Sequence, residues 1–153
     1  MAEGEPLVSV LGLSHVVLRV SDLNRAIDYY DRLFGFRIHS DKRNAMAEGA
    51  SPSVVGVLAG RLAVEIIETT APIVRRARDE PGYVCIAFGV ADAAAALEIL
   101  KSRGLTRFPE VATTPSGHKA VLFRDPDGNI LEFIEIKGAP TMLELAMAGA
   151  KAQ

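Results

Sequence analysis

The chain has 153 residues, of which 49% are hydrophobic and 24% are charged, and its formal net charge at pH 7 is −2. This composition predicts a soluble globular domain with a buried core and excludes an intrinsically disordered chain. The charge balance provides no broad basic surface for a nucleic acid or an anionic membrane, so a small molecule is the expected partner. The single cysteine, Cys85, cannot form an internal disulfide, and no export signal is recognised, so we expect a cytoplasmic protein.

The first half of the chain predicts a strand, a helix and three more strands. An apolar run at residues 13–20 is typical of a buried strand. Asp22 is a suitable helix N-cap, apolar residues recur behind it at helical spacing, and Gly35 predicts the end of that helix. The further strands are expected at residues 36–40, 53–59 and 62–68, and the last two are joined by a tight turn. The segment therefore reads as β-α-β-β-β.

The second half predicts the same order of elements after a connector at residues 69–82. A strand at residues 83–90 leads to the N-cap Asp92, a helical pattern and a stop at Gly104. The strands that complete this half are expected at residues 106–111, 119–124 and 130–137, with a turn within residues 125–129. Residues 141–150 combine capping-box spacing with an apolar stripe, which predicts a C-terminal helix.

The two halves are copies of one module. His15 aligns with Cys85 at a shift of 70 residues, and Glu65 aligns with Glu132 at a shift of 67 residues. A repeat of this length is too long for a solenoid unit, so it indicates a duplicated half-domain whose copies pack together. The expected fold class is α+β, built from two tandem β-α-β-β-β modules.

Strand alternation predicts which side chains share a face. Residues two apart in a strand project to the same side, so His15, Arg19, Glu65, Cys85 and Glu132 all fall on the face opposite the helices. Carboxylates within apolar strands are costly unless they are paired, solvated or bound to a metal. The pattern therefore predicts a functional site on this face of the sheet. The alternative is that the glutamates face a water-filled groove or pair with Arg19 and His15.

These motifs, in this order, resemble the vicinal oxygen chelate superfamily of glyoxalase I, methylmalonyl-CoA epimerase, extradiol dioxygenases, fosfomycin-resistance enzymes and bleomycin-binding proteins. The resemblance covers residues 11–137. The segments that carry it are Ser14-His15-Val16 before Asp22, Tyr29-Tyr30, Gly35-Phe36, residues 86–88 before Asp92, and residues 125–129 before Glu132. It implies that residues 1–153 form a single domain in which the modules make a curved mixed sheet around a cavity, with the helices on the outer face.

The resemblance also implies a divalent metal held by the first and last strands of the modules. By position, His15, Glu65 and Glu132 are the implied ligands, and Cys85 stands where metal-binding members often have histidine. A thiolate favours zinc or another soft-tolerant metal, whereas the alternative makes Cys85 a small buried hydrophobe. Zinc, nickel, manganese and iron are the candidate cofactors, and a site without metal is the alternative.

Three functions are consistent with this resemblance. The first is a metal-dependent lyase or isomerase of the glyoxalase type, with Glu65 as ligand or base and with Arg19 and His118 binding a small oxygenated substrate. The second is a metal-free protein that binds a drug or metabolite, as in bleomycin resistance, where Ala87 and Gly89 would widen the groove. The third, a ring-cleaving dioxygenase, is less favoured because its iron site is expected to use two histidines. The C-terminal apolar stripe and the module exchange that the family permits predict a homodimer.

Overall fold

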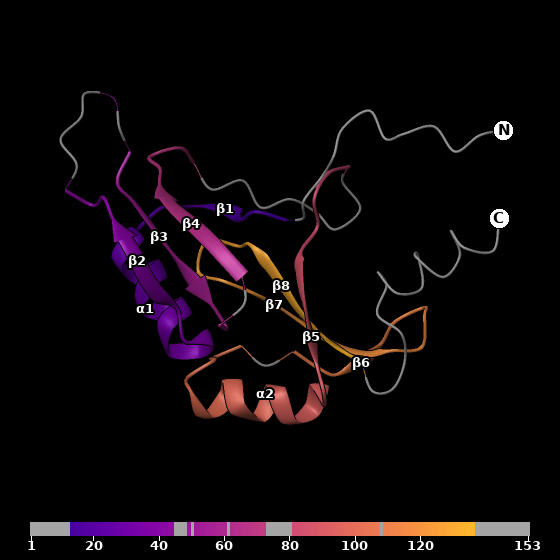
Figure 1. The fold of residues 1–153 in the computed structure, drawn as a ribbon. Coiled ribbons are helices and arrows are strands. Elements are labelled where there is room, and N and C mark those ends of the chain that lie inside the picture. The colour runs from indigo at the N-terminus through magenta and orange to yellow at the C-terminus, as the bar shows by residue number, and fades with distance from the viewer. Residues whose placement is uncertain are drawn as a thin grey trace, which may run out of the picture.

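The fold consists of two β-α-β-β-β modules side by side, seen in a computed structural model that describes residues 13–44, 49, 51–60, 62–72, 81–107 and 109–136 (Figure 1). The first module comprises β1 (Val16–Val20), α1 (Leu23–Phe34), β2 (Arg37–Asp41), β3 (Ser53–Leu58) and β4 (Leu62–Glu68). The second comprises β5 (Ile86–Val90), α2 (Ala93–Ser102), β6 (Ala112–Thr113), β7 (Lys119–Arg124) and β8 (Ile130–Glu135). The predicted repeat and the α+β fold are confirmed.

Each module forms a mixed four-stranded sheet with the same topology. The strand orders are β1-β4-β3-β2 and β5-β8-β7-β6. In both sheets the first strand of the module runs parallel to the last, and the other neighbours are antiparallel. Glu65 lies opposite Val17 in the first sheet, and Glu132 lies opposite Ala87 in the second. The duplicated sequence therefore produces the same strand register twice.

Both helices begin at an aspartate, as predicted. Asp22 and Asp92 each accept a hydrogen bond of 2.9 Å from the backbone N–H three residues later. α1 ends at Gly35, whose φ of 66° is left-handed and suits a residue without a Cβ. α2 ends at Arg103, and Gly104 follows with a φ of +95°. The predicted starts and ends are confirmed to within a residue or two.

A second carboxylate ties each helix to its sheet. Glu68, at the end of β4, accepts a hydrogen bond of 2.8 Å from the backbone N–H of Leu23, and Glu135, at the end of β8, accepts one of 3.1 Å from Ala93. The first N–H groups of a helix have no partner within the helix, so these glutamates satisfy donors that would otherwise be unpaired. They fix the position of each helix relative to the last strand of its module.

One hydrophobic core spans both modules. α1 buries Leu23, Ala26, Tyr29, Tyr30, Leu33 and Phe34. The ring of Phe34 lies 5.7 to 6.3 Å, centroid to centroid, from the rings of Phe88, Phe123 and Phe133 in the second module. Aromatic rings at such distances pack favourably beyond the area they bury. The end of α1 is therefore the point at which the two copies share their core.

The prediction of a strand at residues 106–111 is wrong. β6 covers only Ala112–Thr113, and it pairs only with Ala120 and Lys119 of β7. Pro109 falls within the expected strand, and proline has no N–H to donate to a sheet ladder. The described residues between α2 and β6 therefore run outside the sheet.

The other strand boundaries lie closer to their predicted positions. β1 and β5 begin at Val16 and Ile86, later than the expected starts at residues 13 and 83, because pairing with the last strand of each module begins there. Most of the connector (residues 73–80) and the expected C-terminal helix (residues 141–150) lie outside the described residues. In the described part of the chain, no helix is long and apolar enough to cross a membrane.

Candidate functional site

The first module presents His15 and Glu65 on one face of its sheet. Glu65 lies opposite Val17 across the parallel pair β1 and β4, and His15 precedes Val17 by two residues, so alternation directs all three to the same side. His15 is exposed, with Nδ1 3.1 Å from the hydroxyl of Ser14, and Glu65 is half-buried. Arg19, two residues beyond Val17, is exposed on this face.

The second module brings the equivalent pair into contact. The thiol of Cys85 donates a hydrogen bond of 3.5 Å to Oε2 of Glu132, and both residues are half-buried. Cys85 occupies the position of His15, and Glu132 that of Glu65. A residue just before the first strand of the module thus reaches the carboxylate of the last strand, as expected for two side chains predicted to share a face.

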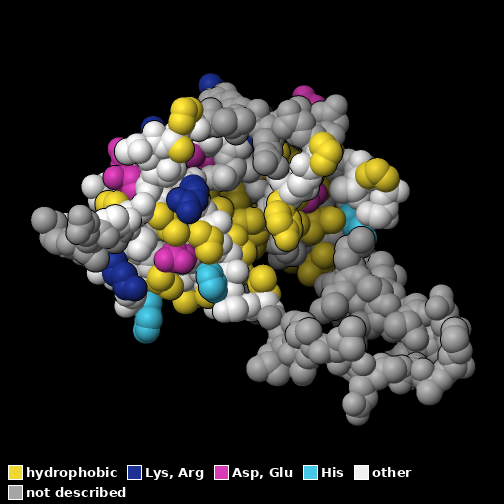
Figure 2. Space-filling model, turned by 90° about the horizontal axis from the view of Figure 1, so that it is seen from above, with side chains coloured by type: hydrophobic (Ala, Val, Ile, Leu, Met, Phe, Trp, Pro, Cys, Tyr) yellow, Lys and Arg dark blue, Asp and Glu magenta, His cyan; other side chains and the backbone are white. Residues whose placement is uncertain are grey.

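The structure does not gather these four side chains into one cluster. Within the described residues of a single chain, no group of three or more His, Cys, Asp or Glu side chains lies close enough to hold a metal ion. Nor does either glutamate form an ion pair with Arg19 or His15 in that part of the chain. Figure 2, which views the molecule from the side opposite α2, shows isolated acidic, basic and histidine side chains among exposed hydrophobic ones. The two predicted ligand pairs thus lie on different sheets in the described part of the chain.

His118 lies beside the second sheet. It is half-buried just before β7, and its Nδ1 lies 3.1 Å from the backbone oxygen of Glu135. A ring nitrogen that faces a carbonyl oxygen must carry the proton, so the other nitrogen is left as the acceptor in neutral histidine. A role for His118 in substrate binding stays a prediction.

Gly89 does not widen a groove. A Cβ built at Gly89 would lie 2.7 Å from Cδ1 of Ile136, so the space beside this glycine is filled by the side chain that follows β8. The expectation that Gly89 makes room for a ligand is therefore wrong, because a neighbouring side chain occupies that room.

A polar network that the sequence did not reveal joins the modules at the turn of residues 125–129. The carboxylate of Asp125 accepts hydrogen bonds from the hydroxyl of Tyr30 at 2.7 Å, from the side chain of Asn129 at 2.8 Å, and from two backbone N–H groups of the turn at 3.0 and 2.7 Å. Asp125 is 5% exposed.

Asp127, in the same turn, accepts hydrogen bonds from the backbone N–H and the hydroxyl of Ser21 at 2.9 and 2.6 Å, and it forms an ion pair with Arg25 at 3.2 Å. The presence of two aspartates in one turn was the signal in the sequence that could have indicated this network.

Two tyrosines of α1 are strongly perturbed at this junction. Burial, followed by the nearby Asp125 carboxylate, raises the pKa of Tyr29 to about 12 and raises the pKa of Tyr30 well above its usual value. Both phenols therefore keep their protons to a higher pH than an ordinary tyrosine, and both act as hydrogen-bond donors. Tyr29 donates to the backbone oxygen of Arg124 at 3.3 Å.

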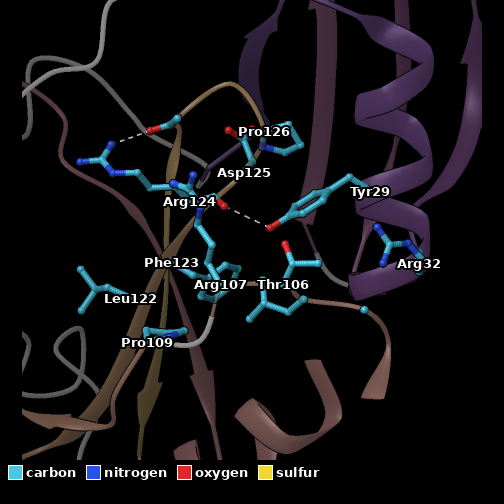
Figure 3. A pocket seen from close by; sticks show the side chains of 13 residues that line it. Tyr29, Arg32, Thr106, Arg107, Pro109, Leu122, Phe123, Arg124, Asp125 and Pro126 are labelled. Atoms are coloured by element: carbon cyan, nitrogen blue, oxygen red, sulfur yellow. Dashed lines mark hydrogen bonds between the residues drawn. The ribbon is translucent and has the colours of Figure 1, made fainter. Parts of the chain in front are cut away.

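A cavity of about 590 Å³ lies between α1, the segment that follows α2, and β7 (Figure 3). Its lining includes Tyr29, Arg32, Arg107 and Arg124, and none of the site residues predicted from the sequence.

Comparison with known proteins identifies the family. Residues 12–133 match the Glyoxalase/Bleomycin resistance protein/Dioxygenase superfamily. The chain is 32% identical over 130 residues to the lactoylglutathione lyase of Haemophilus influenzae, covering 84% of this chain and 96% of that protein. It is 30% identical over 129 residues to the lactoylglutathione lyase of Escherichia coli O157:H7, covering 83% and 94%. The chain therefore belongs to this superfamily.

Solved structures share the fold. The fosfomycin resistance protein FosX from Listeria monocytogenes superposes with a TM-score of 0.66 at 22% identity, covering 92% of this chain and 99% of that one. A glyoxylase/bleomycin resistance protein/dioxygenase domain from Frankia sp. EAN1pec gives a TM-score of 0.65 at 24% identity, covering 83% and 93%. Another structure of the Listeria protein was solved in complex with Mn(II) and a sulfate ion.

Proposed function

We propose that this protein is a divalent-metal-dependent lyase or isomerase of the glyoxalase type. The carrying observation is the 3.5 Å contact between Cys85 and Glu132, because it supports a ligand pair at equivalent positions of both modules. The substrate is a small molecule with adjacent oxygen atoms, such as the hydroxyacyl thioester in the name of the relatives.

The donor atoms suit a divalent cation. His15 supplies an imidazole nitrogen, Glu65 and Glu132 supply carboxylate oxygens, and Cys85 supplies a sulfur, all of which zinc accepts. A bound metal would polarise a carbonyl oxygen of the substrate. Cys85 would have to lose its proton, and with it the hydrogen bond to Glu132, in order to coordinate, so metal affinity should rise with pH.

The proposal requires two copies of the chain, because one chain does not cluster three ligands within its described residues. The pair His15 and Glu65 of one copy would face the pair Cys85 and Glu132 of another. Val17 and Val57 lie on the same face of the first sheet as Glu65, and they are 47% and 38% exposed. Covering such apolar surface with a partner would favour association.

Glu65 is the proposed base. Its carboxylate has no ion pair or hydrogen bond among the described residues, so an oxygen that the metal does not hold is available to accept a proton. It would remove the proton from the substrate carbon beside the polarised carbonyl and return it to the neighbouring carbon. Arg19, on the same face, would bind an anionic group of the substrate.

Activity tests the proposal directly. Untagged protein, loaded separately with zinc, nickel, manganese or iron(II), is given methylglyoxal and glutathione, and thioester formation is followed by ultraviolet absorbance. Glu65→Gln should lower kcat by about 100-fold or more. Glu98→Gln, at an exposed glutamate of α2, is the matched control and should leave kcat unchanged. No thioester with any of these metals, or equal effects of the two variants, would overturn the proposal.

Mixing tests the shared site. Glu65→Gln and Glu132→Gln chains, each inactive alone, should regain part of the activity when subunits exchange, because one mixed site then contains only unaltered ligands. Mass spectrometry shows whether exchange has occurred. Exchange without recovered activity would place all ligands within one chain.

A metal-free binding protein is the second candidate, favoured by the Cys85 contact itself, since thiol and carboxylate satisfy each other without a cation. Calorimetric titration with each metal separates the two. If the natural chain binds none and Cys85→His gains a stoichiometric site, the binding protein is the better description. Metal binding by the natural chain that is lost in His15→Ala supports the enzyme.

A further inference from the structure

The cavity beneath α1 lies beyond the edge strand of the second sheet, β6, which is only two residues long. Among the described residues, β6 pairs with Lys119 and Ala120 at the start of β7, and no strand pairs with residues 121–124 on that side. The segment after α2 passes at a distance and is anchored by Leu105, which is 6% exposed. The resulting volume of about 590 Å³ lies within the range of about 300 to 1,000 Å³ typical of small-molecule sites.

The cavity is positively charged, although the chain as a whole is not. Arg32, Arg107 and Arg124 line it, and Asp125 is the acidic residue of its lining. The Asp125 carboxylate accepts four hydrogen bonds, and Arg32 pairs with Asp28 at 3.7 Å, so the three arginines still outnumber the acidic groups beside them. The local excess of positive charge contrasts with the net charge of −2 of the whole chain.

Arg107 is the arginine that is free to bind. Arg32 donates to the backbone oxygen of Arg103 at 2.7 Å, and Arg124 donates to that of Gly128 at 2.7 Å. Arg107 has no hydrogen bond or ion pair among the described residues. Figure 3 shows it among the other labelled side chains that line the cavity.

The remaining lining is largely apolar, with one phenol. Leu122, Phe123 and Pro126 provide hydrophobic surface, and the hydroxyl of Tyr29 lies at the same wall. A guanidinium forms paired, charge-assisted hydrogen bonds with a carboxylate, and apolar walls favour a hydrophobic body.

We propose that this cavity is a second ligand site that binds a small organic anion, a carboxylate attached to a compact apolar group, with Arg107 as its principal partner. None of the four predicted metal ligands lines this cavity, although Leu122 of its lining lies opposite Glu132 across β7 and β8.

Nuclear magnetic resonance of the full-length protein tests the site with phenylacetate and its neutral counterpart phenylacetamide. Phenylacetate at millimolar concentration should shift the backbone amide signals of residues 104–107 and 122–128. Phenylacetamide should bind about tenfold more weakly or worse, because it cannot form charge-assisted bonds.

Two arginine variants give a matched comparison. Arg107→Gln should weaken phenylacetate binding about tenfold. Arg103→Gln changes the net charge equally at an exposed position whose side chain does not line the cavity, and it should have no effect. Unaltered spectra elsewhere would show that both variants are folded. Metal titration of Arg107→Gln should match the natural chain, so the two proposals can fail independently.

Absence of shifts at these amides overturns the proposal. Equal affinity for phenylacetamide and phenylacetate would also overturn it, because the site would then not recognise the negative charge. Equal weakening in Arg107→Gln and Arg103→Gln, or shifts confined to the surroundings of Glu65, would also overturn it.

Discussion

The two modules share their secondary structure but differ at the edge of the sheet. In the first, β2 pairs along β3, and Phe36 is 3% exposed where it packs over Gly56. At the equivalent positions the second module has Leu105 and Phe123, and the ring of Phe123 stacks on Phe34 at 5.9 Å. The small residue beneath Phe36 lets an edge strand close onto the sheet. Its absence from the second module accompanies an open edge and the cavity.

The two helices differ in what they contact. Tyr29 and Tyr30 of α1 correspond to Ile99 and Leu100 of α2 at the 70-residue shift. The tyrosines cross to the second module, where they bond to Arg124 and Asp125. Leu100 is buried, and Ile99 is 53% exposed. Both copies therefore keep the module, but the polar contacts that join them come from α1 alone among these two helices.

The largest effect should come from removing the centre of that junction. Asp125→Ala would leave the Tyr30 hydroxyl, the Asn129 amide and two backbone N–H groups without their acceptor, so we expect a loss of about 3 kcal/mol of unfolding free energy, or more. Urea denaturation measures it. Asp28→Ala, at an exposed aspartate of α1, should change stability by no more than about 0.5 kcal/mol. Similar losses in both variants would show that the junction does not hold the modules together.

The sheet edge of the first module should be nearly as sensitive. A Cβ at Gly56 would meet the backbone oxygen of Arg37 and the ring of Phe36, the latter at 2.6 Å. Gly56→Ala should therefore cost about 2 kcal/mol by forcing β2 away from β3. Gly60→Ala meets no atom within 4 Å but imposes a φ of +69° on alanine, so about 1 kcal/mol is expected. Thermal denaturation that ranks Gly60→Ala as the more damaging would contradict this account of the edge.

Alkaline pH should weaken the junction through its tyrosines. Their pKa values are raised on folding, from 10.0 to about 12 for Tyr29, so the folded protein holds these protons more tightly than the unfolded chain. The associated stability is complete below pH 10 and is lost as the pH rises towards 12 and beyond. Melting temperatures across this range should fall less steeply for Tyr30→Phe than for the natural chain. Tyr83→Phe, at an exposed tyrosine, should follow the natural chain; a Tyr30→Phe curve that does the same would rule out this linkage.

The smallest effects should be equal in the two modules. Asp22→Ala and Asp92→Ala each remove a 2.9 Å N-cap bond, and each should cost about 1 kcal/mol, while the asparagine variants should be close to neutral. Chemical denaturation of the four variants checks this. A clear inequality between the two alanine variants would mean that the helices are held by different contacts despite their common origin.

The sequence by itself was sufficient for the elements whose signals are local. The caps Asp22 and Asp92 and the stop at Gly35 depend on neighbouring backbone groups, so spacing alone located both helices. Strand alternation likewise predicted that Cys85 and Glu132 share a face, because the direction of side chains in a strand has a fixed period. The ligand roles of His15, Glu65, Cys85 and Glu132 stay predictions.

Tertiary structure decided everything that depends on which distant groups meet. The turn containing Asp125 and Asp127 reads locally as a turn, and its role in joining the modules exists only because Tyr30 and Ser21 arrive from about 100 residues away. Pro109 was a local signal against the strand expected at residues 106–111, whereas the charged cavity beside Arg107 depends on how side chains fill the space over β7. Secondary-structure propensity depends on neighbouring residues and does not describe packing between segments far apart in the chain. These features therefore form only when the two modules fold against each other.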